Sequence, residues 1–360
     1  MTTTVVKEEE LEGLDSTSGG DTLESYPIDS VLIRTENRTV YEIVRRMRNK
    51  QYILDPEFQR DFVWDEKKQS RLIESMLMRI PLPVFYLAEN DNGEVIVVDG
   101  LQRLTTFYRY LDNELTLRGL ESTSLQLEGK KFADLSPKLQ NRLEDTQLIL
   151  YLIDAKAPER AKLDIFERVN GGEPLTRQQM RNSLYMGQAT QWLKVQAKNP
   201  AFFTATAGSI NAKTMRDREV INRFCGFHLL GLETYKGDMD NFLAATLRHM
   251  NGMANLTALS EAFQTSMTNN HNVFGQHAFR KHKPGVIWRN IINVALFDVF
   301  SVILARYPIE WVQTHAETIH QIFFELTTNK IFNDAITNST NSLRKVQTRF
   351  ELAEAAFKEL

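Results

Sequence analysis

The chain has 360 residues, of which 42% are hydrophobic, and its 46 acidic and 43 basic side chains give a net charge of −3. This length and composition can form one large globular domain or two ordinary ones, and they exclude the strongly basic type of protein that coats nucleic acid. The single cysteine, Cys225, excludes an internal disulfide framework and a cysteine-based metal cluster, and its apolar setting predicts a small buried thiol.

No uncharged apolar run is as long as a membrane span, and the N-terminal residues lack the basic and then apolar order of a signal peptide. We therefore expect a cytoplasmic protein that has no membrane partner. Residues 1–25 are rich in threonine, serine, glycine and acidic side chains and carry little apolar surface. This composition predicts a disordered acidic tail, and a docking peptide is the alternative.

From residue 26 to about residue 155 the pattern alternates between helices and strands. In chain order it predicts a helix over 38–47, a short strand from 52 that runs into an aromatic loop, and a helix over 66–80 capped by Asp65. Strands over 84–88 and 94–98, joined by a turn at 90–93, come next, and a helix over 101–111 follows them. The last predicted elements are a short strand within 115–120, a helix over 137–144 and a strand over 147–153 that is buried on both faces.

After residue 156 the pattern is helical. A helix over 159–169 should end at Gly171, and Thr176 should begin the next helix through a capping box with Gln179. Further helices are expected over 189–198, 217–231, 238–265, 285–306, 308–327 and 340–359. The predicted organisation is therefore a tail over 1–25, an α+β domain with a mixed sheet over 26–185 and an all-helical domain over 186–360.

The stretch 94–111 places polar side chains where a strand passes directly into a helix. Asp99, Gln102 and Arg103 lie at this corner, and Gly100 lets the backbone approach a bound group. The first helical N–H groups lack intrahelical partners, so the natural ligand is an anion, above all a phosphate. The alternative is a tight turn in which Asp99 caps the helix and Arg103 makes a surface ion pair.

Two more polar clusters lie at the ends of apolar elements. The first contains Gln59 and Arg60 with Trp64; the second contains Arg168, Asn170, Gly171 and Gly172 with Gln178 and Arg181. Together with the corner they suggest one pocket with guanidinium groups and a carboxylate. A guanidinium suits phosphate because its planar fork makes paired, charge-assisted hydrogen bonds, and a carboxylate such as Asp99 would orient the arginines or hold Mg²⁺.

Three motifs, over 58–64 (FQRDFVW), 99–106 (DGLQRLTT) and 166–176 (FERVNGGEPLT), together resemble the N-terminal domain family of GmrSD-type, modification-dependent restriction endonucleases. The resemblance spans about residues 26–185. It implies a ParB/sulfiredoxin-like fold and a corner that binds and hydrolyses nucleotides, which regulates DNA cleavage by a separate nuclease domain. It implies a core site of Asp99, Gln102 and Arg103, with Gln59, Arg60 and Asn170 in support.

The sequence departs from the commonest family pattern in two ways. Leu101 stands where a glutamine is often found. The HNH-type nuclease domain of such enzymes is also missing, because the histidine-bearing stretch 269–282 lacks the motif's His-x-x-Pro start. We therefore expect a stand-alone form, and in that stretch a polar loop rather than a metal site. The stretch is locally basic, so contact with a nucleic-acid backbone is an alternative.

These features predict a regulatory component of a DNA-processing or antiviral defence system that binds, and in the extended hypothesis hydrolyses, a nucleoside triphosphate with Mg²⁺. Asp99, Gln102 and Arg103 would form the catalytic group. The phosphate-binding group would be Gln59, Arg60, Gly100, Arg103, Arg168, Asn170 and Gly171. One alternative is a metal-dependent nuclease that uses Asp99 with Glu57 and Asp61. The other is a non-enzymatic adaptor that docks a partner nuclease or a second copy. A partner nuclease, DNA and a homo-oligomer are the candidate partners.

Overall fold

The computed structural model describes residues 11–14, 33–53, 64–89, 93–120, 126–169, 176–358 and 360. These residues form two compact units. The α/β unit contains the described residues from 33 to 169 together with 182–184, and the helical unit contains residues 11–14, 176–181 and those from 185 onward.

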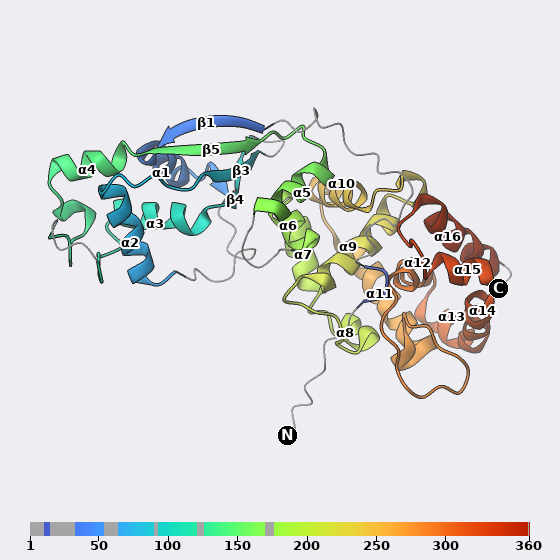
Figure 1. The fold of residues 1–360 in the computed structure, drawn as a ribbon. Helices are drawn as coiled ribbons and strands as arrows, with labels where there is room; N and C mark the ends of the chain where they lie inside the picture. The colour runs from blue at the N-terminus through green and yellow to red at the C-terminus, as the bar shows by residue number, and fades with distance from the viewer. Residues whose placement is uncertain are drawn as a thin grey trace, which may run out of the picture. The chain divides into compact units, whose positions relative to one another are not determined.

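A five-stranded mixed sheet is the centre of the α/β unit (Figure 1). The strands are β1 (Ile33–Thr39), β2 (Tyr52–Ile53), β3 (Phe85–Glu89), β4 (Val95–Asp99) and β5 (Gln147–Ile153), and their spatial order is β1-β5-β3-β4-β2. The pairs β1–β5 and β3–β4 are antiparallel, and β3–β5 and β2–β4 are parallel.

Helices cover one face of this sheet, and the opposite face is partly exposed along β1 and β5. Figure 1 shows α2 and α3 on the same side of it, and the apolar side chains of both pack in one core with those of α1 and with Val95 and Val97 of β4. Since successive strand residues point to opposite faces, Ile96 and Val98 face the other side, where α5 packs against β4. The bounds are α1 (Val40–Arg48), α2 (Glu66–Leu77), α3 (Leu101–Leu111), α4 (Pro137–Glu144) and α5 (Glu159–Val169).

The helical unit is built around α12, in which every residue is buried. Asn293 starts this helix by accepting a hydrogen bond from the Leu296 N–H at 2.9 Å, and α9, α11 and α16 pack against it. The helices are α6 (Arg177–Leu184), α7 (Gln188–Gln196), α8 (Pro200–Thr206), α9 (Arg216–Leu229), α10 (Met239–Gly252), α11 (Thr257–Phe274), α12 (Val294–Leu304), α13 (Ile309–Thr314), α14 (Ala316–Thr328), α15 (Lys330–Ala335) and α16 (Leu343–Phe357).

The predicted fold class, a mixed α+β region followed by a helical region, is confirmed. The predicted caps are confirmed too. The Asp65 side chain accepts a hydrogen bond from the Lys68 N–H at 2.7 Å, and Thr176 and Gln179 form the reciprocal capping box. Cys225 is a buried free thiol, and burial raises its pKa well above the usual value.

Two predictions about strands are wrong. Residues 115–120 form no strand; Leu117 instead exchanges backbone hydrogen bonds with Gly129 and Lys130 around a local turn. β5 is not buried on both faces, because Ile149 is 45% exposed. The core with α1, α2 and α3 takes Leu148, Leu150 and Leu152, and the alternate side chain of Ile149 points away from it. The expected turn at 90–93 lies outside the described residues except for Gly93.

Several helix boundaries also differ from the prediction. The helix expected over 238–265 is two helices, α10 and α11, and the helix expected over 285–306 begins only at Val294. Periodicity does not detect such breaks, because the apolar pattern continues on both sides of them. The polar loop expected over 269–282 is also wrong at its start, since Asn269 and Asn270 are fully buried in α11. Their side-chain amides donate to the backbone carbonyls of Leu304 and Phe300 in α12.

Part of the expected disordered tail is ordered. Leu11 and Leu14 are only 6% and 9% exposed and belong to the core of the helical unit. Between them, Glu12 forms a parallel β-bridge with Asn293. The prediction failed because it weighed average composition, whereas two leucines at the right spacing are enough to anchor a short segment. The other residues of 1–25 lie outside the described residues.

Candidate functional site

The corner, residues 99–103, is built by the direct passage of β4 into α3. Gly100 has a φ of +104°, and a Cβ there would lie 2.3 Å from Cδ1 of Phe85, so the position requires glycine. Gly100 is also the N-cap residue, and it supplies no side-chain acceptor to the first turn of α3. The start of α3 is therefore an uncapped helix N-terminus with its positive dipole end at the corner.

Arg103 is held by acceptors from β4 and from the residues just before β3. Its guanidinium donates to the carbonyl oxygens of Pro83 and Val84 and to Oδ2 of Asp99, the last at 2.7 Å. Its Cζ lies 4.2 Å from the ring centroid of Phe85, a cation–π contact. Burial lowers the pKa of Arg103 and the Asp99 carboxylate opposes that shift. The arginine thus fixes the start of β3 against α3 while keeping its charge beside the helix N-terminus.

Asp99 does not cap α3, so that part of the alternative interpretation is wrong; its described hydrogen bond goes to Arg103. The ion pair of the alternative is confirmed, although it is partly buried rather than superficial. The Asp99 side chain is 38% exposed and that of Arg103 is 11% exposed. The carboxylate is therefore the accessible member of the pair.

Gln102 connects the corner to the end of the first motif. Its Oε1 accepts a hydrogen bond from the Trp64 N–H at 3.4 Å. The Trp64 carbonyl in turn accepts from Gln69, whose own Oε1 accepts from Arg109 at 2.8 Å. Sequence reasoning missed Gln69 and Arg109 as supports of the corner, because a buried glutamine within an amphipathic helix leaves no local signal.

The remaining predicted residues are not gathered at the corner by the described structure. Gln59, Arg60, Asn170 and Gly171 lie outside the described residues, as do Gly172, Glu57 and Asp61. Arg168 lies on α5, the helix that packs against β4, and is exposed. Gln178 and Arg181 are buried instead, and Arg181 donates to Gln178 and to Asp240 of α10, both at 2.8 Å.

Among the described residues, no group of three histidine, cysteine, aspartate or glutamate side chains could hold a metal ion. At the corner, Asp99 is a single carboxylate with one oxygen paired to Arg103. That donor set fits Mg²⁺ only in the manner in which protein-bound Mg²⁺ is usually shared between one or two carboxylates, waters and ligand phosphates. No described helix has the length and apolar character needed to cross a membrane.

A comparison with curated proteins returned no significant match. A comparison with protein families matched residues 40–186 to the model of the GmrSD restriction endonuclease, N-terminal domain. This match covers all three motifs of the sequence analysis and nearly the whole α/β unit. The predicted resemblance is therefore confirmed over residues 40–186, where the chain matches the model of the GmrSD restriction endonuclease, N-terminal domain.

Proposed function

We propose that the corner binds the phosphates of a nucleoside triphosphate with Mg²⁺, and that the protein uses this binding as a regulatory component of a DNA-processing or antiviral defence system. The observation that carries the proposal is the uncapped start of α3 beside a fixed guanidinium and a half-exposed carboxylate. Helix N-termini of this kind are ready anion sites, and the family model that residues 40–186 match is named for a restriction endonuclease.

The three side chains of the corner would divide the work. The first N–H groups of α3 would hold phosphate oxygens, and the guanidinium of Arg103 would supply positive charge next to them. Gln102, fixed by the Trp64 N–H, would orient the ligand through its amide. When bound, Mg²⁺ neutralises phosphate charge, and Asp99 is the described carboxylate that would hold it.

Hydrolysis is an extension of the same proposal. Asp99 is the one carboxylate among the corner's residues, and its exposure lets it position a water beside a bound phosphate. Arg103, held by the carbonyls of Pro83 and Val84, would stabilise charge without having to reorganise. Gln59, Arg60, Arg168, Asn170 and Gly171 would complete the phosphate site. A partner nuclease, DNA or a second copy would receive the resulting signal.

Titration calorimetry with each of the four ribonucleoside triphosphates, with and without Mg²⁺, tests the proposal. We expect Arg103→Ala to weaken binding by about 10- to 100-fold, the equivalent of one or two charge-assisted hydrogen bonds. Asp99→Asn should remove the Mg²⁺ dependence and any phosphate release. Arg46→Ala, a change in an arginine on α1 that pairs with Glu42, is the matched control and should bind as the unmodified chain does.

Three results would contradict the proposal or redirect it. Binding that survives Arg103→Ala in a folded variant would remove the corner as the site. Cleavage of plasmid or modified phage DNA without nucleotide, lost in Asp99→Asn, would favour the nuclease alternative. A partner nuclease that binds equally well with and without nucleotide, and equally well to the Arg103 variant, would favour the adaptor.

A further inference from the structure

Residues 11–14, which we call the docking segment, contact the helical unit through one β-bridge at Glu12 that is followed directly by a turn at Gly13 and Leu14. Glu12 pairs in parallel with Asn293. The Glu12 N–H donates to the carbonyl of Ile292 and the Glu12 carbonyl accepts from the N–H of Val294, both at 2.9 Å. Main-chain hydrogen bonds of this kind, combined with pockets for side chains, are a general means of peptide recognition.

Each side chain of the segment meets a matching part of the helical unit. Leu11 and Leu14 are buried in its apolar core. Gly13 has a φ of +86°, and a Cβ on it would lie 3.1 Å from Oγ1 of Thr340, so a larger residue is disfavoured there. The groove thus selects leucine at the first and fourth positions and glycine at the third.

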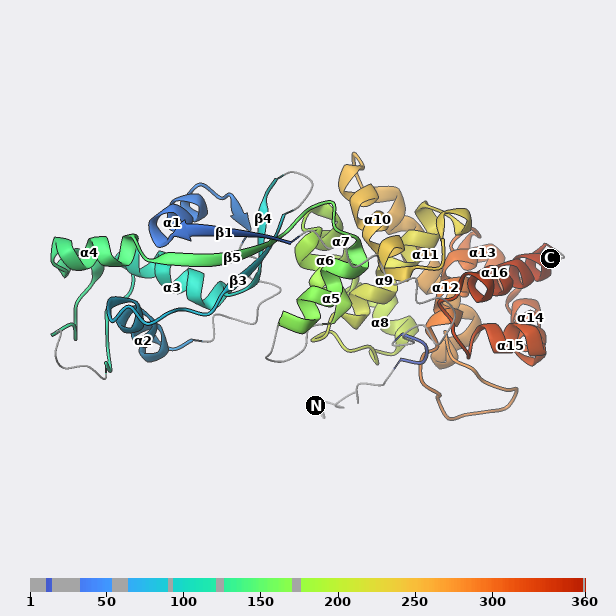
Figure 2. The same ribbon diagram turned by 45° about the horizontal axis from the view of Figure 1, so that its top comes forward.

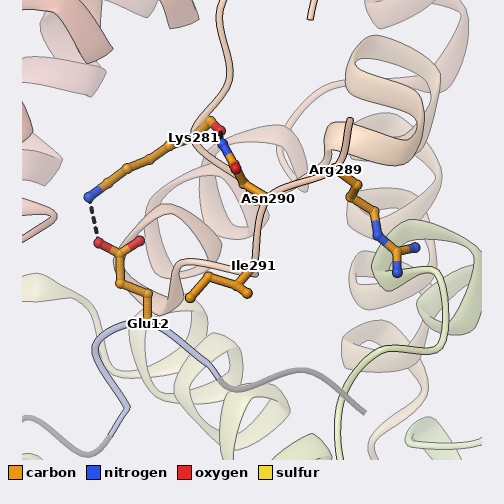
Figure 3. Close-up of a pocket in the computed structure, with 5 residues that line it drawn as sticks. All are labelled: Glu12, Lys281, Arg289, Asn290 and Ile291. Atoms are coloured by element: carbon orange, nitrogen blue, oxygen red, sulfur yellow. Dashed lines mark hydrogen bonds and ion pairs between the residues drawn. The ribbon is translucent and has the colours of Figure 1, made fainter. Parts of the chain in front are cut away.

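Glu12, the second residue of the segment, is recognised through an ion pair with Lys281. Nζ of Lys281 lies 2.6 Å from Oε1 of Glu12 and also donates to Oγ1 of Thr337 at 2.7 Å. Figure 3 shows this ion pair beside a cavity of about 350 Å³ that Asn290 and Ile291 help to line. Apart from Glu12, the cavity is lined by residues of the loop between His277 and Val294, which projects from the helical unit in Figure 2. A longer ligand would find room there.

The receiving edge is built by contacts that do not involve the docking segment. The Asn293 side chain donates to the carbonyl of Ile336 at 2.7 Å and caps α12. The fully buried Arg280 closes the base of the loop, because its guanidinium donates to the Thr206 carbonyl and the Ser209 hydroxyl at 2.9 and 2.8 Å. The edge would therefore keep its shape if the segment left.

We propose that this edge is a peptide-binding site for an acidic peptide of the pattern Leu-Glu-Gly-Leu that turns at its glycine, and that the docking segment is its covalently linked, exchangeable occupant. Residues 15–32 separate the segment from β1 along the chain, so the segment is covalently linked to the edge that it occupies and competes with a free peptide as part of the same molecule. A free peptide of the same pattern would bind by displacing the segment. This inference does not depend on nucleotide binding at the corner.

A labelled synthetic peptide with the sequence of residues 6–19 tests the site by fluorescence anisotropy. We expect the double variant Leu11→Ser, Leu14→Ser of the full chain to bind this peptide at least tenfold more tightly than the unmodified chain, because its own segment no longer competes. Adding Lys281→Glu should weaken binding at least fivefold. A peptide with the Glu12→Lys change should bind this charge-reversed variant better than the original peptide does.

Peptides carrying Gly13→Val or serine at both leucines are matched controls and should not bind. The proposal is overturned if the peptide binds the unmodified chain and the double variant equally, or if a folded double variant binds no peptide. In the latter case the segment is a fixed part of the fold that does not exchange with peptides.

A second measurement covers a double variant that does not fold. A protease site inserted between Gly19 and Gly20 of the full chain allows the N-terminal fragment to be cut free after folding. Size-exclusion chromatography with excess labelled peptide should then show the fragment replaced by the peptide within hours. A fragment that stays bound and never exchanges would overturn the proposal.

Discussion

Arginine–aspartate pairs occur in both units, and their surroundings differ. In the helical unit, Asp298 is completely buried between Arg223, at N···O distances of 2.6 and 2.8 Å, and Arg349, at 2.6 Å. At the corner, the Asp99 carboxylate is 38% exposed and bonds to one arginine. Burial alone would lower the pKa of both arginines beside Asp298. The Asp298 carboxylate raises the pKa of Arg223 above its usual value, but the pKa of Arg349 remains lowered.

Charged side chains in fully buried pairs stabilise the fold, whereas a charged side chain that reaches solvent can bind a ligand. Every carboxylate oxygen of Asp298 has a buried guanidinium partner, so this triad has no capacity left for a ligand. Arg181 is likewise buried, and its terminal nitrogens donate to Gln178 and Asp240 within the helical unit. An arginine motif in the sequence therefore predicts a site only when its carboxylate partner reaches solvent.

The largest expected effect is at the triad. Asp298→Ala leaves two guanidinium groups buried without their partner, and we expect the free energy of unfolding of the helical unit to fall by about 3–5 kcal/mol. Chemical denaturation followed by tryptophan fluorescence measures this. Arg306→Ala, which breaks an exposed pair with Glu354, is the matched control and should change it by less than about 1 kcal/mol. An equal loss of stability in Asp298→Ala and Arg306→Ala would contradict the difference between buried and exposed pairs.

An effect of intermediate size is the pH dependence of stability, which should come mainly from the helical unit. Burial lowers the pKa of His282 from 6.5 to about 4, next to His277 and His320. Between pH 6.5 and pH 4, His282 binds a proton in the unfolded chain but not in the folded chain. The free energy of unfolding therefore falls by up to about 3 kcal/mol as the pH drops from 6.5 to 4.

Asp217 acts in the opposite sense. Burial raises its pKa from 3.8 to about 6, so its contribution to stability rises as pH drops from 6 to 3.8. His282→Asn should therefore flatten the loss of stability on acidification, and Asp217→Asn should steepen it, as measured by urea denaturation between pH 4 and 7. Identical pH profiles for the two variants would contradict this assignment.

The smallest effect on stability concerns the corner, where a loss of binding should exceed the loss of folding. Gly100→Ala combines a positive φ with a clash at Phe85, the ring on which Arg103 packs, and should cost about 1–3 kcal/mol. Gly93 has a φ of +75°, and a Cβ on it would have no neighbour within 4 Å. Gly93→Ala therefore measures the cost of the backbone conformation without a side-chain clash. Thermal melts together with nucleotide titrations should show lost binding only for Gly100→Ala.

Much of the α/β unit could be predicted from local pattern. Period-two and helical spacing located β3, β4, β5 and the helices around them, and cap residues such as Asp65 and Thr176 marked where helices begin. The three motifs also identified the domain family, which the match over residues 40–186 confirms. These features depend on neighbours within a few positions, and such neighbours are visible in a sequence.

Contacts between distant segments were decided only by the tertiary structure. Arg103 finds its backbone acceptors 19 and 20 residues upstream, and Asp298 meets arginines 75 and 51 residues away. The docking segment pairs with an edge near residue 293, and the acidic composition around it predicted disorder. Such contacts depend on which surfaces the folded chain brings together, and they leave no periodicity in the sequence. By itself the sequence determined where the strand-to-helix corner at residues 99–103 would form, and the tertiary structure decided which of its charges are already paired.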